Sequence, residues 1–356
     1  MKFSQNTILI ISNEAWGDIW YSKHNWAFEL SKSNTVFFIN PPTNWVFKNL
    51  FSIKINTKKY TDNLWILYYN NRLPYTRYGL IYRLNEKIVS SALKKWFFKN
   101  NINNYIFWTF DPYRFSNPLL LNPIKSIYFI ADLYRIKREK RLLKNVDHVF
   151  FVSQILADEI KIKNPLILSH GISESEFVVE KLIEKYRNSI LYIGGIDFRL
   201  DYILIRKLLE AFPNEIFLFI GHINFSENTD FKTIFIEKRF PNLVYHQPVH
   251  FKELKNYIAV AKCCLAPMIL EVQGNHINHH KLLQYLALGK PVLSAKFIDY
   301  SEKRLLLIYE THEDAIKLLT QLINKGEDSI SAIQRIEFSK QFLYNSLIKK
   351  IETFIE

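Results

Sequence analysis

The residues that point most directly to chemistry lie in one run, His280-Lys281-Leu282-Leu283-Gln284-Tyr285-Leu286-Ala287-Leu288-Gly289-Lys290-Pro291-Val292. Its apolar residues recur at helical spacing, which predicts a short amphipathic helix that ends at Gly289. Lys281 falls in the first turn, where the backbone N–H groups and the helix dipole already favour an anion. The pattern predicts a phosphate clamp at Lys281, with Gln284 one turn further on and able to hydrogen-bond sugar hydroxyls. The alternative is an ordinary amphipathic helix with solvated polar ends.

This run resembles the signature P-x-K-L-x-E-Y-x-A-x-G-x-P-V-V of the family 4 glycosyltransferases, which have the GT-B fold. Stretches of the second half resemble, in the right order, the first strand and loop of that family's donor domain, its second strand and turn, and the segment near the base: 190–201, 217–221 and 242–257. Stretches of the first half resemble the acceptor domain: Trp16-Gly17-Asp18 with Ser22, His24 and Ala27, then 131–132, 139–153 and 169–172. The resemblance covers nearly the whole chain, and it is nearest to bacterial cell-surface polysaccharide glycosyltransferases of the teichuronic-acid type.

The resemblance implies a donor site that holds a nucleotide-linked sugar. Arg199, after the Gly194-Gly195 turn, and Lys281 would clamp the diphosphate; the alternative for Arg199 is a salt bridge to Asp197 or Asp201. The donor-binding residues that we expect are Gly17, Gly195, Arg199, Gly221, Val249, Asn275, His276, Lys281 and Gln284. Glycine at three of these positions would let the backbone approach the ligand closely.

Two positions depart from the family's pattern. The glutamate expected to bind the donor ribose is Gln284, and the glutamate eight residues before it is His276. Glutamine still hydrogen-bonds a ribose diol, but without the charge assistance of a carboxylate. These two changes keep open a catalytically inactive member of the family.

On the acceptor side, two residues are candidates for catalysis together with Arg199 and Lys281. Asp132 follows an expected strand, 126–130, so it would take the acceptor's proton or hold its hydroxyl group. The alternative for Asp132 is an N-cap of the following helix. His24 lies on the first expected helix, and its alternative is a core or surface position.

The elements that must position these residues alternate in type, which is typical of parallel βαβ units. Expected strands are 7–11, 35–39, 64–68, 105–108, 126–130, 148–152, 189–193, 216–220, 243–245, 262–266, 292–295 and 305–308. Expected helices are 22–30, 78–98, 135–144, 153–162, 202–211, 230–238, 251–259, 279–287 and 313–323, with one or two more in 328–355. We therefore predict an α/β protein with two Rossmann-like parallel-sheet domains that face a cleft, and ligands bind at the strand carboxyl ends of such sheets.

The expected domain boundary lies in the polar stretch 166–188. An acceptor domain would span 1–172, with 341–356 packing back on it, and a nucleotide-sugar domain would span 173–340. The length of 356 residues fits two domains. Cys263 and Cys264 are adjacent inside an apolar run and are expected to be small core residues of a reduced, intracellular protein.

The net charge of +13 would attract phosphates of any kind, although an AT-rich genome would also produce this composition. Lysines alternate with aromatic residues in 45–60 and 94–99, which suits an anionic membrane surface. The alternative is core aromatics between solvated lysines. No nucleic-acid module and no zinc spacing accompanies these stretches, and no run of apolar residues reaches the length of a membrane-spanning helix.

The sequence thus predicts a glycosyltransferase that moves a sugar from a nucleotide-diphosphate donor to a polysaccharide or lipid-linked acceptor. By the resemblance, the reaction retains the anomeric configuration and needs no metal or other cofactor. We expect a cytoplasmic protein with peripheral contact to an anionic membrane and no nucleic-acid partner. The alternative is a non-catalytic GT-B-like protein that binds nucleotide sugars or a partner in the same pathway.

Overall fold

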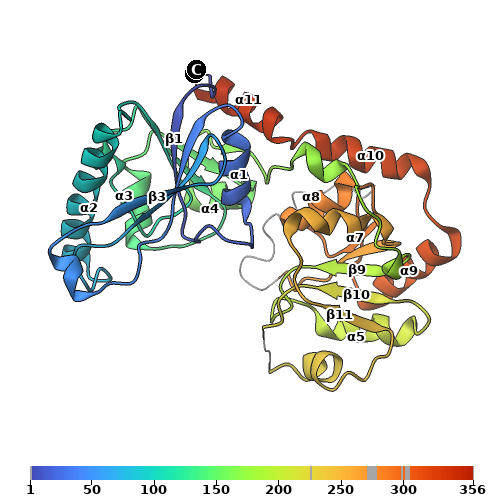
Figure 1. Cartoon of the computed structure of the whole chain (residues 1–356). Helices are drawn as coiled ribbons and strands as arrows, with labels where there is room; N and C mark the ends of the chain where they lie inside the picture. The colour runs from blue at the N-terminus through green and yellow to red at the C-terminus, as the bar shows by residue number, and fades with distance from the viewer. Residues whose placement is uncertain (1, 225–226, 271–278, 298–299, 301–304, 356) are drawn as a thin grey trace. The chain divides into compact units, whose positions relative to one another are not determined.

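Strands of continuous apolar sequence form the centre of each half of the chain. In β1 (Thr7–Ile11), for example, Ile8 to Ile11 are fully buried, because helices cover both faces of the sheet. The computed structural model describes residues 2–224, 227–270, 279–297, 300 and 305–355. It divides into two units, Met1–Leu168 with Ile348–Glu356, and Ser169–Leu347 (Figure 1).

The first unit has an eight-stranded sheet in the order β3-β4-β2-β1-β5-β6-β7-β8. Its strands are β1, β2 (Thr35–Ile39), β3 (Ile55–Lys59), β4 (Leu64–Tyr69), β5 (Ile106–Thr109), β6 (Lys125–Ile130), β7 (His148–Phe151) and β8 (Leu166–Ile167). Its helices are α1 (Ser22–Leu30), α2 (Gly79–Lys99), α3 (Lys137–Leu143) and α4 (Gln154–Ile160), with short 3₁₀ turns at Phe47–Leu50 and Pro118–Leu121. Strand order runs outward in opposite directions from β1 and β5, so the switch point of this sheet lies between them.

The expected strands of this unit are all present, and the sequence analysis missed two. Strand β3 pairs antiparallel with β4 at the sheet edge, and after Ile55 its residues are all polar and half-buried or exposed. The expected helix 135–144 begins two residues late, at Lys137, because Arg135 has a positive φ of 50° that no helix accommodates.

The second unit has a six-stranded parallel sheet in the order β11-β10-β9-β12-β13-β14. Its strands are β9 (Ile190–Ile193), β10 (Phe217–Ile220), β11 (Leu243–His246), β12 (Cys263–Ala266), β13 (Val292–Ser294) and β14 (Leu307–Ile308). Its helices are α5 (Tyr202–Ala211), α6 (Thr229–Phe231), α7 (Leu254–Val260), α8 (His280–Ala287), α9 (His312–Lys325) and α10 (Ser329–Lys340), with 3₁₀ turns at Glu174–Phe177, Glu184–Tyr186 and Phe251–Glu253 and a π-turn at Lys232–Ile236. The switch point here lies between β9 and β12.

The chain passes between the units twice, and the two passing segments pair with each other inside the second unit. Ile172 and Leu343 form an isolated parallel bridge, and the ring of Tyr344 lies against Gly171. The units therefore divide at 168/169 and 347/348, whereas the sequence places the boundaries at 172/173 and 340/341. Helix α11 (Tyr344–Ile355) ends against the first unit, where Phe354 contacts the rings of His148 and Phe150.

Two further expectations concern buried and membrane-spanning residues. Cys263 and Cys264 are buried on β12, and burial raises the pKa of both thiols, as expected for small core residues. Within the described parts of the chain, no helix combines the length and the apolar composition that crossing a bilayer requires.

Candidate functional site

The loop that follows β9 forms the floor of the candidate site, at the switch point of the second sheet. Asp201 donates its backbone N–H to Pro267 (2.9 Å), and Ile269 donates to Arg199 (3.0 Å), so the loops after β9 and β12 are fixed to one another. Ligands of open α/β sheets bind at such a position.

Two glycines allow these strand ends to meet. Gly194 and Gly221 have φ values of 136° and 156°, where side chains other than hydrogen are strained. A Cβ at Gly221 would lie 1.8 Å from the carbonyl oxygen of Gly194. Gly221 is therefore needed for the close approach of β9 and β10, and this approach fixes the position of Gly194 in the site.

Lys281 extends from the first turn of α8 over Gly194. Its Nζ donates to the Tyr192 hydroxyl (3.0 Å) and lies 4.3 Å from the centre of that ring. A Cβ on Gly194 would lie 2.7 Å from Nζ, so the glycine leaves room for the ammonium. Burial, followed by the positive charge of Arg199, lowers the pKa of Lys281 to about 7, while Asp197 acts in the opposite direction.

Arg199 provides the second positive charge. Its Nε and Nη2 donate to the two carboxylate oxygens of Asp197, at 2.9 and 2.7 Å. The sequence analysis named this salt bridge as the alternative to phosphate binding. Arg199 is nevertheless 41% exposed, so its guanidinium faces solvent as well as Asp197. The salt bridge fixes the orientation of a side chain that still reaches the surface.

The group carries two cations and one carboxylate at a helix N-terminus. Within the described residues, no side chain caps α8 and no acidic residue lies in its first turn. Burial is the main cause of the lowered pKa of Lys281, and the nearby charge of Arg199 adds to it, so two cations are crowded at this position. A diphosphate would relieve that crowding, because its charge is negative and its oxygens accept charge-assisted hydrogen bonds.

This crowding predicts that binding of a nucleotide sugar weakens with rising pH. Lys281 loses its proton as the pH rises through about 7, and the diphosphate prefers the charged form. Above that pH we expect affinity to fall by up to about tenfold per pH unit, until the higher pKa of the complex is reached. Calorimetry in two buffers of different ionisation enthalpy should show proton uptake on binding above neutral pH. Binding without proton uptake, at an affinity independent of pH, would contradict this role of Lys281.

Gln284 is buried and donates its Nε2 to Glu176, at 2.7 Å. Glu176 belongs to the 3₁₀ turn Glu174–Phe177, and its other carboxylate oxygen accepts from the backbone N–H of Ser173 (3.1 Å). The sequence analysis missed Glu176, because nothing in the local pattern links it to a residue so far along the chain. The family's pattern has a glutamate where this chain has Gln284. The carboxylate of Glu176 lies beside that position.

This pairing predicts the outcome of a charge exchange. Gln284→Glu would place two carboxylates in contact, and we expect it to lower the free energy of unfolding by about 1–3 kcal/mol at neutral pH. Adding Glu176→Gln should restore most of the loss, because one carboxylate and one amide again face each other. Urea unfolding of the two single variants and the double variant measures the coupling. If the effects of the two substitutions simply add, the contact is not significant for stability.

The remaining donor-side candidates are placed as follows. Val249 is half-buried and packs against the apolar core of the second unit. Gly195 lies next to the Asp197–Arg199 pair, since a Cβ there would be 3.0 and 3.1 Å from these side chains. Asn275 and His276 lie outside the described residues. Gly17 is on the first unit, exposed and with open space around its Cα, and its carbonyl accepts from the Trp20 indole (3.1 Å).

His24 is fully buried in the first unit. Its Nδ1 accepts the backbone N–H of Tyr21 and its Nε2 lies 3.1 Å from the Ala15 carbonyl, which fixes one neutral tautomer. Burial lowers the pKa of His24 to about 4. With both ring nitrogens bound to backbone, His24 has the core position that the sequence analysis gave as its alternative.

Asp132 is exposed, just beyond the carboxyl end of β6. Helix α3 has Ile136 as its N-cap, so the alternative of an N-cap role for Asp132 is wrong. Burial, followed by the charge of Asp132, raises the pKa of the neighbouring Tyr134. Asp132 thus remains a candidate at the ligand-binding edge of the first sheet.

Side chains that could ligate a metal ion do not cluster in the described part of the chain. No group of three or more His, Cys, Asp or Glu side chains lies close enough together there to hold an ion.

Two solved structures share the fold of this chain. The α,α-trehalose-phosphate synthase of Burkholderia xenovorans superposes with a TM-score of 0.67 at 10% identity, over 98% of this chain and 99% of that one. The sucrose-phosphate synthase of Thermosynechococcus elongatus gives a TM-score of 0.65 at 11% identity, over 99% and 98% of the two chains. The chain has the GT-B fold.

At the level of sequence the likeness is narrower. No family model matches the chain. A segment of 165 residues is 24% identical to TuaH of Bacillus subtilis (strain 168), whose name assigns it as a glycosyltransferase of teichuronic acid biosynthesis. The match covers 45% of this chain and 41% of that relative. A shared fold does not by itself fix the reaction, which the residues of the site decide.

Proposed function

We propose that this GT-B protein is a glycosyltransferase that takes its sugar from a nucleotide-diphosphate donor held by the second unit. The observation that carries the proposal is the pair of cations, Lys281 and Arg199, crowded at the switch point and the N-terminus of α8. The likeness to TuaH and to two sugar-phosphate synthases supports the same reaction class.

Lys281 and Arg199 would stabilise the leaving group. As the bond between the sugar and the diphosphate breaks, negative charge grows on the departing diphosphate oxygens. Cations fixed in advance, one by the Tyr192 ring and one by Asp197, stabilise that charge without reorganisation. We propose a metal-independent reaction on this basis, and retention of anomeric configuration by likeness to the family.

Gln284 and Glu176 would hold the donor's ribose. The amide and the carboxylate lie together at 2.7 Å, so a ribose diol could bond to both. The glycan or lipid-linked acceptor would bind to the first unit, where Asp132 lies at the carboxyl edge of the sheet and could accept the hydroxyl proton.

Turnover tests this proposal against the non-catalytic alternative. The full chain is incubated with UDP-, GDP- and dTDP-sugars, with and without a chelator and an acceptor glycan, and release of the nucleoside diphosphate is followed. Release from one donor that persists with chelator supports a metal-independent transferase. Tight binding of a donor without any release would favour a nucleotide-sugar binding protein in the same pathway.

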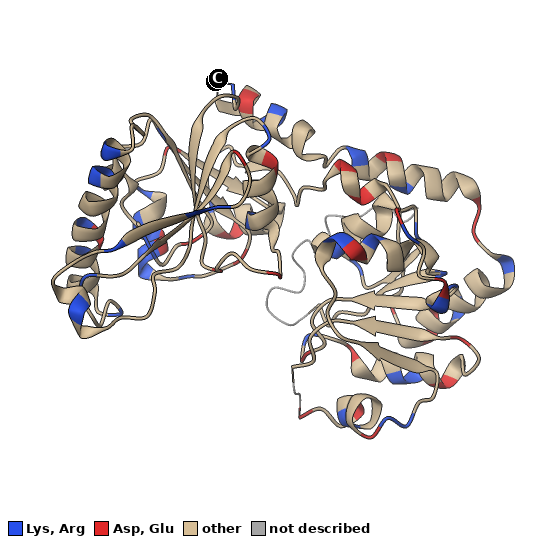
Figure 2. Cartoon of the chain, viewed as in Figure 1, with Lys and Arg blue, Asp and Glu red and all other residues tan. Residues whose placement is uncertain are grey.

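We further propose that the outward face of α2 binds an anionic membrane from the cytoplasmic side. Leu80 and Phe98 are 83% and 75% exposed, and Figure 2 shows Lys and Arg along the same helix. A basic helix with exposed apolar residues suits the headgroup region of an anionic bilayer. In the other lysine-rich aromatic stretch, Phe47 and Phe51 are also exposed. Phe97 is buried, so of these three residues it alone fits the alternative that the aromatic residues belong to the core.

Vesicle sedimentation tests the α2 surface. Phosphatidylglycerol vesicles should pull down the chain, and phosphatidylcholine vesicles should not, because the attraction is electrostatic. Leu80→Ser with Phe98→Ser should reduce the bound fraction several-fold, and Ile330→Ser, an exposed apolar residue of α10, should not. Equal sedimentation of the α2 variant and the unaltered chain would rule this surface out.

A further inference from the structure

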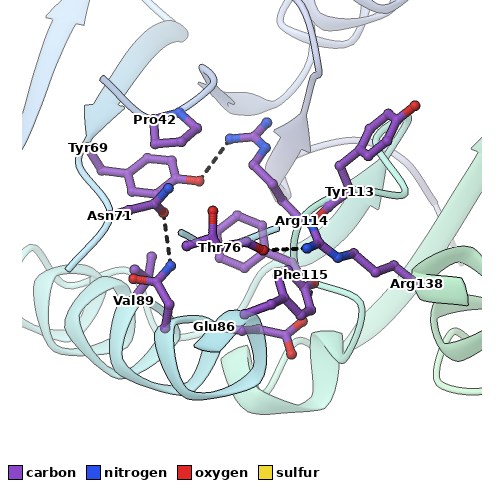
Figure 3. A pocket seen from close by; sticks show the side chains of 12 residues that line it. Pro42, Tyr69, Asn71, Thr76, Glu86, Val89, Tyr113, Arg114, Phe115 and Arg138 are labelled. Atoms are coloured by element: carbon purple, nitrogen blue, oxygen red, sulfur yellow. Dashed lines mark hydrogen bonds between the residues drawn. The ribbon is translucent and has the colours of Figure 1, made fainter. Parts of the chain in front are cut away.

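A separate cavity of about 200 Å³ lies within the first unit, at the carboxyl edge of its sheet (Figure 3). Its walls come from the end of β4, from the segments after β2 and β5, from α2 and from α3. The volume is below the roughly 300–1,000 Å³ of pockets that take drug-sized ligands, so it fits one sugar ring better than a whole nucleotide sugar.

Two of the charged residues in the wall are neutralised by neighbours. Arg114 donates to Asp111 (2.5 Å) and to the Tyr69 hydroxyl (2.9 Å), and it also bonds to carbonyls after β1 and β2. Glu86 accepts from Arg141 (2.9 Å) and from the Tyr82 hydroxyl (3.0 Å). These buried pairs make a rigid wall, because each charged group has a fixed partner.

Arg138 differs from these pairs. Its guanidinium carbon lies 3.8 Å from the centre of the Tyr82 ring, and its N–H groups donate to the carbonyls of Tyr113, Thr76 and Arg77. Those acceptors are neutral, and among the residues that the structure describes no carboxylate forms an ion pair with Arg138. The pocket therefore carries one uncompensated positive charge, on a group whose position is fixed.

The other walls suit a carbohydrate. Figure 3 shows aromatic rings and side-chain amides facing the same space. The ring of Tyr113 and the amides of Asn71 and Asn85, which are bonded to each other at 3.0 Å, line this pocket, and such groups suit the C–H face and the hydroxyl groups of a sugar. A guanidinium beside them selects for a planar or tetrahedral oxyanion.

We propose that this pocket binds one anionic sugar residue of the acceptor, with Arg138 contacting its carboxylate or phosphate group. The inference rests on the proposed transferase function. Its position supports that role, because Tyr113 at the pocket contacts Tyr134 (5.5 Å between ring centres), whose pKa responds to Asp132. Asp132, the candidate base, and the pocket thus lie at the same carboxyl edge of the first unit's sheet.

Ligand-observed NMR and calorimetry on the full chain test the pocket with glucuronate, glucose 6-phosphate and glucose. We expect at least about tenfold tighter binding of one anionic sugar than of glucose, as for a charged hydrogen bond. The anionic sugar that binds more tightly identifies the group as carboxylate or phosphate. Arg138→Gln should remove the preference, whereas Arg83→Gln, an exposed arginine of α2, should leave it unchanged.

A melting curve confirms that each variant is folded, and Arg138→Lys serves as a milder second variant that keeps the charge but not the planar fork. Equal binding of glucose and both anionic sugars, no binding of either anionic sugar, or an unchanged preference in folded Arg138→Gln would overturn the proposal. Binding of a nucleotide sugar is measured in the same samples. If it persists while the anionic sugars fail, only the pocket is wrong; if it fails while they bind, only the donor assignment is wrong.

Discussion

Lys281→Met should greatly weaken the binding of a nucleotide-diphosphate sugar and at the same time make the chain more stable. Binding should weaken by about 10- to 100-fold or more, because a charged donor to the diphosphate is lost. Calorimetric titration of the unaltered chain and the variant with the donor that binds measures this loss. Lys207→Ala, which removes a lysine paired with Glu313 on the surface of the same unit, is the matched control.

The gain in stability follows from the sign of the pKa shift. Folding lowers the pKa of Lys281 from 10.5 to about 7, so the charged lysine opposes folding at every pH below its unfolded value. The opposition is greatest below about pH 7, where the lysine is charged in both states. Lys281→Met should therefore raise the melting temperature more at pH 6 than at pH 10. A variant that loses both binding and stability would mean that Lys281 has a structural role.

Gly221→Ala should destabilise the second unit by at least about 3 kcal/mol. The added Cβ would lie 1.8 Å from the Gly194 carbonyl, and that oxygen belongs to a backbone that has nowhere to move while β9 and β10 stay paired. The melting temperature of this unit should fall by roughly 6–12 °C. Nucleotide-sugar binding should fall with it, because Gly194 forms the floor under Lys281.

Gly79→Ala is the control for that substitution. Gly79 is the first residue of α2, and a Cβ there meets nothing within 4 Å. Since alanine has less freedom in the unfolded chain, this variant should be unchanged or about 0.4–1 kcal/mol more stable. Differential scanning calorimetry of the two variants compares them directly. If Gly221→Ala melts like Gly79→Ala, the close approach of β9 and β10 is not a requirement of the fold.

The sequence predicted most of the framework because the framework is local. Buried strands such as β1 and β9 are recognisable as short apolar runs. Helix α8 is recognisable from the helical spacing of its apolar residues and from Gly289 after its end. The elements that were missed have weak local signals. Strand β3 is polar after Ile55 and lies at an exposed edge, and β8 has only two residues.

The residues of the candidate site also divide into those that the sequence predicts and those that only the fold brings together. Lys281 and Gly221 stand within recognisable runs, so their positions follow from the sequence. Glu176 beside Gln284, and Arg138 on Tyr82, are contacts between segments far apart in the chain, and only the fold brings them together. The backbone partners of His24 could not be predicted, because a helical histidine gives no sign of whether backbone groups occupy both its nitrogens.

A crystal structure of the chain soaked with UDP-, GDP- and dTDP-sugars would test the central claim most directly. We predict density for the diphosphate of one donor within hydrogen-bond distance of Lys281 Nζ and the Arg199 guanidinium, at the N-terminus of α8. The ribose should lie against Gln284 and Glu176. The account would be contradicted if saturating donor occupied another part of the chain while Lys281 kept its hydrogen bond to Tyr192.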